Sequence, residues 1–238
     1  MARQPRLVLP GHPQHIIQRG INRAVIFHDK DDYQCYLTKL GHLCEQFNCK
    51  LHAYVVMDNH VHLLLTPFAT NSLSKLMQSL GRHYAHYFNN KYNRTGTLWD
   101  GRYKSCLLDA EQYLITCQQY IELNPVRAGL VATPAAYTWS SYHKNASGLE
   151  DVLITEHEIY CKLGSTKTAR QAHYQALLEK PANIETLQII RDNTNNAWVL
   201  GDDRFREKIA TRLQRQTAPK PRGGDRRSQH YHSLSNSN

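Results

Sequence analysis

Apolar side chains recur along the first half of the chain with two periods, one typical of strands and one typical of helices. At three- and four-residue spacing they run through 31–47 and 73–88, which predicts two amphipathic helices. Asp58 and Asn59 separate two of the strand-like runs and suit a tight hairpin turn. The short β-prone runs that predict strands are 15–18, 50–57, 60–67 and 103–108.

This order, βαββαβ, predicts an α+β fold of the ferredoxin-like kind, an antiparallel sheet with helices on one face. A further helix is expected from about Asp109 to Asn124. It should end there, because Pro125 disfavours the helical conformation in the residue before it. After that point the pattern predicts helices alone, near 155–163, 168–179 and 184–192, and around Phe205, Ile209 and Leu213.

We therefore expect three segments in this chain of 238 residues. Residues 1–145 form the main domain, with the helix at 109–124 added to its sheet, and residues 146–216 form a helical C-terminal extension. Residues 217–238 are rich in Pro, Gly, Arg and Ser, which is typical of a disordered basic tail.

The charge balance favours a polyanionic partner. The chain has 29 Lys and Arg against 20 Asp and Glu, a formal net charge of +9, and nine of its cations lie in residues 204–227. Nucleic acid is the first candidate. A membrane is disfavoured, because no apolar run approaches the roughly 18 residues that a span needs.

The remaining composition indicates the compartment. Residues 1–10 lack the apolar core of a secretory signal. The six cysteines contain no C-x-x-C pair, so neither a structural zinc site nor a disulfide framework is indicated. We expect a reducing cytoplasm.

His60 and His62 form the first candidate chemical motif. Residues two apart in a strand point to the same face, so the two imidazoles lie side by side while Val61 faces the other way. Such a pair can chelate a metal ion. The alternative is a pair of core histidines with buried hydrogen-bond partners; with 14 histidines one H-x-H is expected by chance, and His230-Tyr231-His232 is a second.

Tyr120 and Asn124 form the second candidate chemical motif. A separation of four places a phenol and an amide on one helix face, while Leu114, Cys117 and Ile121 point to the core. Most tyrosines in a chain simply pack, and Tyr113, earlier on nearly the same face, is the rival to Tyr120.

Three ordered motifs together resemble the REP-associated tyrosine transposases, members of the single-tyrosine HUH superfamily of the insertion-sequence 200/605 type. The resemblance covers about residues 10–145 and returns in residues 200–205, L-G-D-D-R-F. The motifs are H-V-H at residues 60–62, G-T-L-W-D-G-R-Y-K-S at residues 96–105 and Y-I-E-L-N-P-V-R-A-G-L-V at residues 120–131.

The resemblance implies a role for each motif. His60 and His62 are the metal-binding pair, Tyr120 is the nucleophile, and Asn124 stands where related enzymes have a Gln that completes the metal site. It also implies metal-dependent cleavage and joining of single-stranded DNA that carries hairpins of repetitive extragenic palindromes. The intermediate is a 5′-linked phosphotyrosine.

The residue types agree with this chemistry. A phenol has a pKa of about 10, so it needs a nearby cation to act as a nucleophile at neutral pH. Two imidazoles and an amide are neutral ligands that leave the ion its full charge to polarise a phosphate. Mg²⁺ is the expected ion, and imidazole ligands suit Mn²⁺ equally well.

Basic residues near these motifs are the expected DNA contacts, namely Arg19, Arg23, Arg102 and Lys104, with Arg82 and Arg127 as further phosphate contacts. Trp99, Tyr103 and Tyr92 are candidates for stacking on unpaired bases. The protein acts as a monomer or a homodimer.

Two alternatives remain open. A non-catalytic regulator that binds hairpin DNA predicts binding without a divalent metal. A zinc hydrolase using His60 and His62 needs a third histidine or a carboxylate beside the pair, and forms no covalent adduct.

Overall fold

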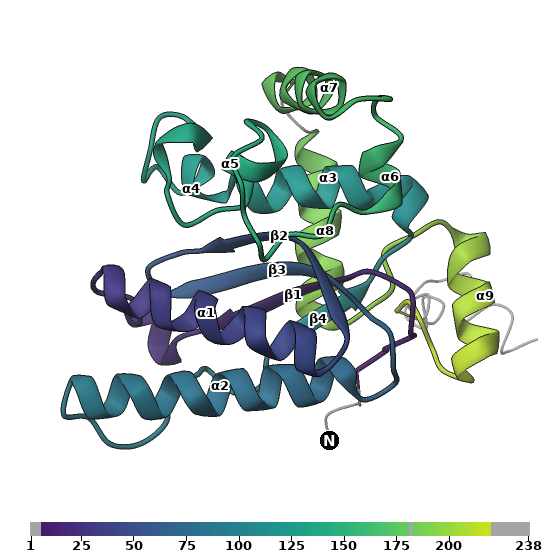
Figure 1. The fold of residues 1–238 in the computed structure, drawn as a ribbon. Coiled ribbons are helices and arrows are strands. Elements are labelled where there is room, and N and C mark those ends of the chain that lie inside the picture. The colour runs from purple at the N-terminus through teal and green to yellow at the C-terminus, as the bar shows by residue number, and fades with distance from the viewer. Residues whose placement is uncertain (1–5, 181–182, 220–238) are drawn as a thin grey trace, which may run out of the picture.

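The computed structural model describes residues 6–180 and 183–219. A four-stranded antiparallel sheet lies at its centre, with helices on both faces (Figure 1). The strand order is β2-β3-β1-β4. It confirms the predicted ferredoxin-like α+β arrangement, in which the two strands of each βαβ unit are separated by one strand of the other unit: β3 lies between β1 and β2, and β1 lies between β3 and β4. The strands are β1 (Gln14–Arg19), β2 (Cys49–Val56), β3 (His60–Pro67) and β4 (Lys104–Leu107).

Helices α1 (Lys30–Gln46) and α2 (Ser72–Lys91) cover one face of the sheet (Figure 1). The Asp29 carboxylate caps α1 by accepting hydrogen bonds from the backbone N–H groups of Asp31 and Asp32. Val61, Leu63 and Leu65, alternate residues of β3, are buried in this layer. The intervening residues of the strand therefore face the other layer.

Helix α3 (Ala110–Glu122) crosses β2 and β3 on that other face, and α8 (Ile184–Asn196) packs against β4 and β1. Leu114, Cys117 and Ile121 are fully buried, as their spacing predicts. Further helices lie on the same side of the sheet as α3 (Figure 1). They are α5 (Tyr142–Asn145), α6 (Glu158–Cys161) and α7 (Lys167–Glu179); the chain also has two 3-10 turns, η1 (Ile21–Arg23) and η2 (Pro134–Ala136).

The prediction that the chain leaves the helix at Pro125 is wrong in one respect. Helix α3 ends at Glu122, and a new turn, α4 (Asn124–Arg127), starts at once with Pro125 in its first turn. Proline has no N–H to continue the ladder of α3, but a helix needs no N–H donor in its first turn. The helical path therefore continues, with a break at Leu123.

The C-terminal helices pack onto the sheet edge. In α9 (Asp203–Leu213), Ile209 is buried with Leu7, Leu9, Leu107 and Val199. Thr217, in the segment expected to be a disordered tail, is 5% exposed, and its carbonyl accepts a hydrogen bond of 2.9 Å from the Val199 N–H. Residues 220–238, including the second H-x-H pattern, lie outside the described residues.

No helix in the described ranges is long and apolar enough to cross a bilayer.

Candidate active site

The two histidines of β3 face α3 together. Val61 points into the α1–α2 layer, so His60 and His62 point the other way, and their ring centroids are 5.0 Å apart. In the sheet, His62 lies opposite Ile17 of β1 and Val55 of β2, whereas His60 lies at the strand end opposite Arg19. One ligand candidate is thus deep in the fold, at 2% exposure, and the other is half-buried at the rim.

The hydrogen bonds of His60 define its tautomer. Its Nδ1 lies 2.6 Å from the side-chain oxygen of Asn59, which can only accept, so Nδ1 carries the proton. The Asn59 amide is itself oriented, because its Nδ2 donates to the Arg23 carbonyl at 3.3 Å. His60 therefore keeps an unprotonated Nε2.

The turn that carries Arg23 is backbone-constrained. Asn22 and Arg23 both have positive φ angles, 52° and 59°. A side chain on Gly20 would lie 2.6 Å from the Ala24 carbonyl oxygen, so only glycine fits at the entry to the turn. This tight turn returns the Arg23 carbonyl to Asn59, and it brings Arg23 beside the histidines.

The second histidine also offers its Nε2. The Asn124 side-chain nitrogen donates to His62 Nε2 at 3.0 Å, which requires a lone pair on that atom. Burial, helped by Arg19, lowers the pKa of His60 to about 4. Burial, helped by His60, His15 and nearby arginines, lowers the pKa of His62 well below its usual value. Both rings are neutral at neutral pH, so two imidazole nitrogens and one amide can hold a divalent cation.

Tyr120 reaches the same place from α3. It is 4% exposed, and its ring meets His62 edge-on with centroids 5.8 Å apart. Arg127, on α4, lies over the ring with its guanidinium carbon 4.5 Å from the centroid, and it also donates to the Tyr120 carbonyl. The turn after Pro125 is what brings this cation back over the phenol.

These side chains line one cavity of about 580 Å³. His60, His62, Tyr120 and Asn124 lie together there, and Asp100 is the one acid among the described lining residues. The structure thus brings together the predicted nucleophile, the three predicted metal ligands and the four main predicted DNA contacts, whereas Tyr113 is partly buried against the core and does not line the cavity. The cations of the lining are Arg19, Arg23, Arg102, Lys104, Arg127 and Arg191.

Four other predicted DNA contacts are not at this site. Trp99 is 8% exposed and its indole N–H donates to the Gly81 carbonyl at 2.8 Å, while Tyr103 is 9% exposed. Their exposed area is too small to stack on a base, so that prediction is wrong for both. Tyr92 donates to Asp32 at 2.8 Å, and Arg82 lies on α2, across the sheet from the cavity.

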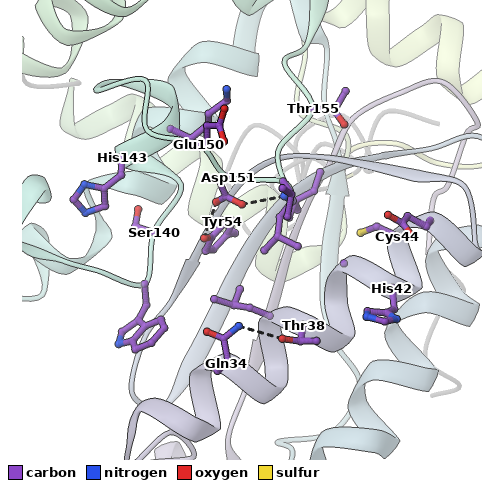
Figure 2. A pocket seen from close by; sticks show the side chains of 18 of the residues that line it. Gln34, Thr38, His42, Cys44, Tyr54, Ser140, His143, Glu150, Asp151 and Thr155 are labelled. Atoms are coloured by element: carbon purple, nitrogen blue, oxygen red, sulfur yellow. Dashed lines mark hydrogen bonds between the residues drawn. The ribbon is translucent and has the colours of Figure 1, made fainter.

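A larger hollow of about 980 Å³ lies between α1 and residues 138–155 (Figure 2). Figure 2 shows Asp151 inside it, where it accepts a hydrogen bond of 2.9 Å from the Tyr54 hydroxyl. Glu45, Glu150 and Asp151 line this hollow with Lys144 as the lone Lys or Arg among the described residues around it. This charge balance does not suit a phosphate backbone, and none of the predicted site residues is present.

Comparison with known proteins gives a match over the part of the chain that contributes most of the cavity. Residues 10–124 match the family model described as "Transposase IS200 like". This part of the chain is similar to the IS200-like transposase family. The matched range ends at Asn124, and it includes the positions of the histidine pair and Tyr120. This match supports a transposase-like function.

One solved structure supports the fold of this chain. This structure, a REP-associated tyrosine transposase bound to a REP hairpin, has a TM-score of 0.55 at 18% identity and covers 66% of this chain and 93% of its own. Another, a putative transposase from Deinococcus radiodurans R1, has a TM-score of 0.35 at 22% identity, over 51% of this chain and 96% of its own. The comparison with curated proteins found no match.

Part of the cavity comes from outside the family match. Arg191 and Asn195 of α8 line it, and Lys104 donates to the Asn195 side chain at 2.9 Å. Sequence reasoning missed both. Their four-residue spacing indicates a shared helix face. Nothing in the sequence links that face to the histidines, because the link is made only by packing of α8 against β1 and β4.

Sequence reasoning also missed His15, which is fully buried behind His62. Its ring centroid is 5.2 Å from that of His62 and 5.5 Å from that of Tyr120. The signal was present, because His15 and Ile17 share the face of β1 that pairs with the histidine face of β3.

Proposed function

We propose that this protein is a transposase that cleaves and rejoins single-stranded DNA bearing palindromic hairpins, with Tyr120 as nucleophile and a divalent cation held by His60, His62 and Asn124. The observation that carries the proposal is the shared cavity. Two unprotonated imidazole nitrogens, an amide and a phenol meet inside a ring of six cations. That combination suits a phosphate that is to be attacked.

Mg²⁺ or Mn²⁺ on these ligands would polarise the scissile phosphate and stabilise the charge that develops on it. Asn124 now turns its Nδ2 toward His62, and half a turn of the amide would present its oxygen instead. That rotation needs no backbone movement. The break at Leu123 keeps Asn124 one turn from Tyr120 and beside His62, where it could join the two histidines as a ligand.

The chemical step belongs to Tyr120. Its phenol oxygen forms a bond to phosphorus while the bond from phosphorus to the 3′-oxygen breaks. The phenol proton passes to solvent, and the departing oxygen takes up a proton to become a 3′-OH. The product is a 5′-phosphotyrosine, and attack by a 3′-OH on that phosphate reverses the step and joins strands without ATP.

The surrounding cations would bind the DNA backbone. Arg19 and Arg23 approach from the end of β1, and Arg102 and Lys104 from the start of β4. Phosphate contacts of this kind position a strand without reading its sequence.

The two alternatives receive less support. A binding protein has no use for a tyrosine nucleophile in the same cavity as two histidine ligands. A zinc hydrolase needs a third ligand of its own, and within the described ranges no group of three or more His, Cys, Asp or Glu is placed to hold a metal ion.

The test is a covalent adduct. Incubation with Mg²⁺ and a hairpin-bearing single strand, labelled on the 3′ side of the cut, should give a protein–DNA species that survives denaturation. Tyr120→Phe should abolish cleavage and adduct while hairpin binding persists, because the change removes one oxygen and keeps the ring.

The matched control is Tyr113→Phe on the same helix, about two turns away, or roughly 10 Å. It should cleave like the wild type. If Tyr120→Phe still cleaves DNA, water is the nucleophile and the zinc-hydrolase alternative replaces this proposal. If only Tyr113→Phe loses the reaction, Tyr113 is the nucleophile in place of Tyr120.

A further inference from the structure

A buried polar chain runs from the metal-ligand candidate His62 into the C-terminal helix α8. It consists of His62, His15 of β1 and Thr194 of α8; His15 and Thr194 are fully buried. His62 Nδ1 lies 2.9 Å from His15 Nε2, and His15 Nδ1 lies 2.8 Å from the Thr194 hydroxyl. Helix α8 lies outside the family match, which ends at residue 124.

The Thr194 end of this series of hydrogen bonds determines which atom donates and which accepts in each of them. The Thr194 hydroxyl donates to the Ile190 carbonyl at 2.8 Å, and a carbonyl can only accept. The hydroxyl has one proton, so its oxygen accepts from His15 Nδ1. His15 Nε2 is then unprotonated and accepts from His62 Nδ1. His62 consequently carries its proton on Nδ1 and turns a lone pair on Nε2 to the cavity.

We propose that His15 and Thr194 are positioning residues that hold His62 in the ring orientation and tautomer required to bind the divalent cation. The inference rests on the proposed function. It assigns to α8 a part in the metal site that the family's matched segment alone does not contain.

The physical basis is the second hydrogen bond of a ligating histidine. A ring that donates its other N–H to a fixed acceptor loses rotational freedom and keeps the correct nitrogen bare. His60 has such an acceptor in the Asn59 oxygen. For His62 the acceptor is a buried imidazole rather than a carboxylate, so no negative charge is added behind the ion, and the ion keeps its full charge toward a phosphate.

The experiment measures Mn²⁺ affinity of the full-length protein by titration calorimetry and electron spin resonance, without DNA. Thr194→Val keeps the shape of the side chain and removes the hydroxyl, whereas Thr194→Ser keeps the hydroxyl. His15→Leu removes the acceptor, whereas His15→Gln supplies a side-chain oxygen in its place. We expect Thr194→Val and His15→Leu to weaken Mn²⁺ binding by about tenfold or more, with Thr194→Ser and His15→Gln closer to wild type.

A second readout is the tautomer of His62 in metal-free protein, measured by ¹⁵N NMR. The wild type should carry the proton on Nδ1, and the two disruptive variants should show a mixture. Thermal unfolding checks that all four variants fold. A merely structural role would lower the melting temperature of Thr194→Val and leave both the tautomer and the affinity of the folded protein unchanged.

The outcomes separate this inference from the proposed function. Wild-type Mn²⁺ affinity in both Thr194→Val and His15→Leu, in a protein whose wild type binds Mn²⁺ and forms the adduct, overturns the inference alone. A wild type that binds no Mn²⁺ overturns both.

Discussion

The two candidate ligands differ in their surroundings, and the difference affects what their removal does. His60 is half-buried at a strand end and is oriented by its sequence neighbour Asn59. His62 is 2% exposed and connects the cavity to His15 behind it. The same substitution at the two positions therefore removes the same ligand type from very different environments.

We expect His60→Ala and His62→Ala each to abolish metal-dependent cleavage at saturating Mg²⁺. His60→Ala should melt near the wild type. His62→Ala should in addition lose stability, because it opens a buried space and leaves His15 Nε2 without a partner, a cost of about 1–3 kcal/mol. Cleavage assays and thermal unfolding measure the two effects. Cleavage equal to wild type in either variant would contradict the metal assignment.

At the scale of elements, α3 combines the catalytic candidate with a buried carboxylate. Glu122, two residues after Tyr120, is fully buried and accepts hydrogen bonds from the Ser141 hydroxyl at 2.6 Å, the Asn145 amide at 2.7 Å and the Tyr174 hydroxyl at 2.8 Å. It connects α3 to α5 and α7. The C-terminal half of α3 thus packs on the sheet on one side and is hydrogen-bonded to residues of α5 and α7 on the other.

This carboxylate should make stability depend on pH. Burial raises the pKa of Glu122 from about 4.5 to about 7, even though its three donors act in the opposite direction. Because the folded pKa is the higher one, its stabilising contribution is present below about pH 4.5 and is lost as the pH rises through about 7. From about pH 4 to about pH 8, the unfolding free energy of the wild type should fall by up to about 3 kcal/mol more than that of Glu122→Gln.

Urea unfolding across this range measures the difference. Glu111→Gln, an exposed position on the same helix, is the control and should follow the wild type. A Glu122→Gln variant with the pH profile of the wild type would show that this carboxyl stays charged in the folded state.

The elements that sequence could predict are those whose signals are local. The strand period placed His60 and His62 on one face, and three- and four-residue spacing gave α1, α2 and α3 close to their observed ends. Pro125 misled because a proline that ends one helix can equally open the next. His15, Thr194 and Arg191 were missed for a different reason: their roles arise from packing between segments far apart in the chain, and no local pattern encodes it.

At the scale of the whole molecule, part of the positive charge near the C-terminus is carried by a folded helix, α9. Arg204, Lys208 and Arg212 are exposed and lie four residues apart, so they form a stripe along one face of α9, while Ile209, on a different face, is buried in the core. Arg206 is engaged instead, with Asp203 at 3.2 Å. Deleting this region would remove core packing together with charge, so substitution is the cleaner probe.

We expect replacement of the stripe, Arg204→Gln, Lys208→Gln and Arg212→Gln together, to weaken binding of single-stranded DNA and to flatten its salt dependence. The slope of log affinity against log salt should fall by about 0.7 for each phosphate that the variant no longer neutralises. Fluorescence anisotropy over a series of salt concentrations measures it.

The control replaces three exposed cations on α1 and α2, across the sheet from the cavity: Lys30→Gln, Lys75→Gln and Arg82→Gln. It removes the same formal charge and should change the slope less. Equal slopes in the two triple variants would mean that the stripe acts only through net charge.

The late position of α8 in the chain also has a consequence for timing during synthesis. The strands and α3 are complete by Glu122, but Arg191, Thr194 and Asn195 are made about 70 residues later. Domains fold as they emerge from the ribosome, N-terminal part first. A nascent chain can therefore hold a folded sheet and Tyr120 while the helix that supports His62 is still unmade. An enzyme able to nick the DNA of its own cell would in this way acquire its full cutting site only after α8 has been made.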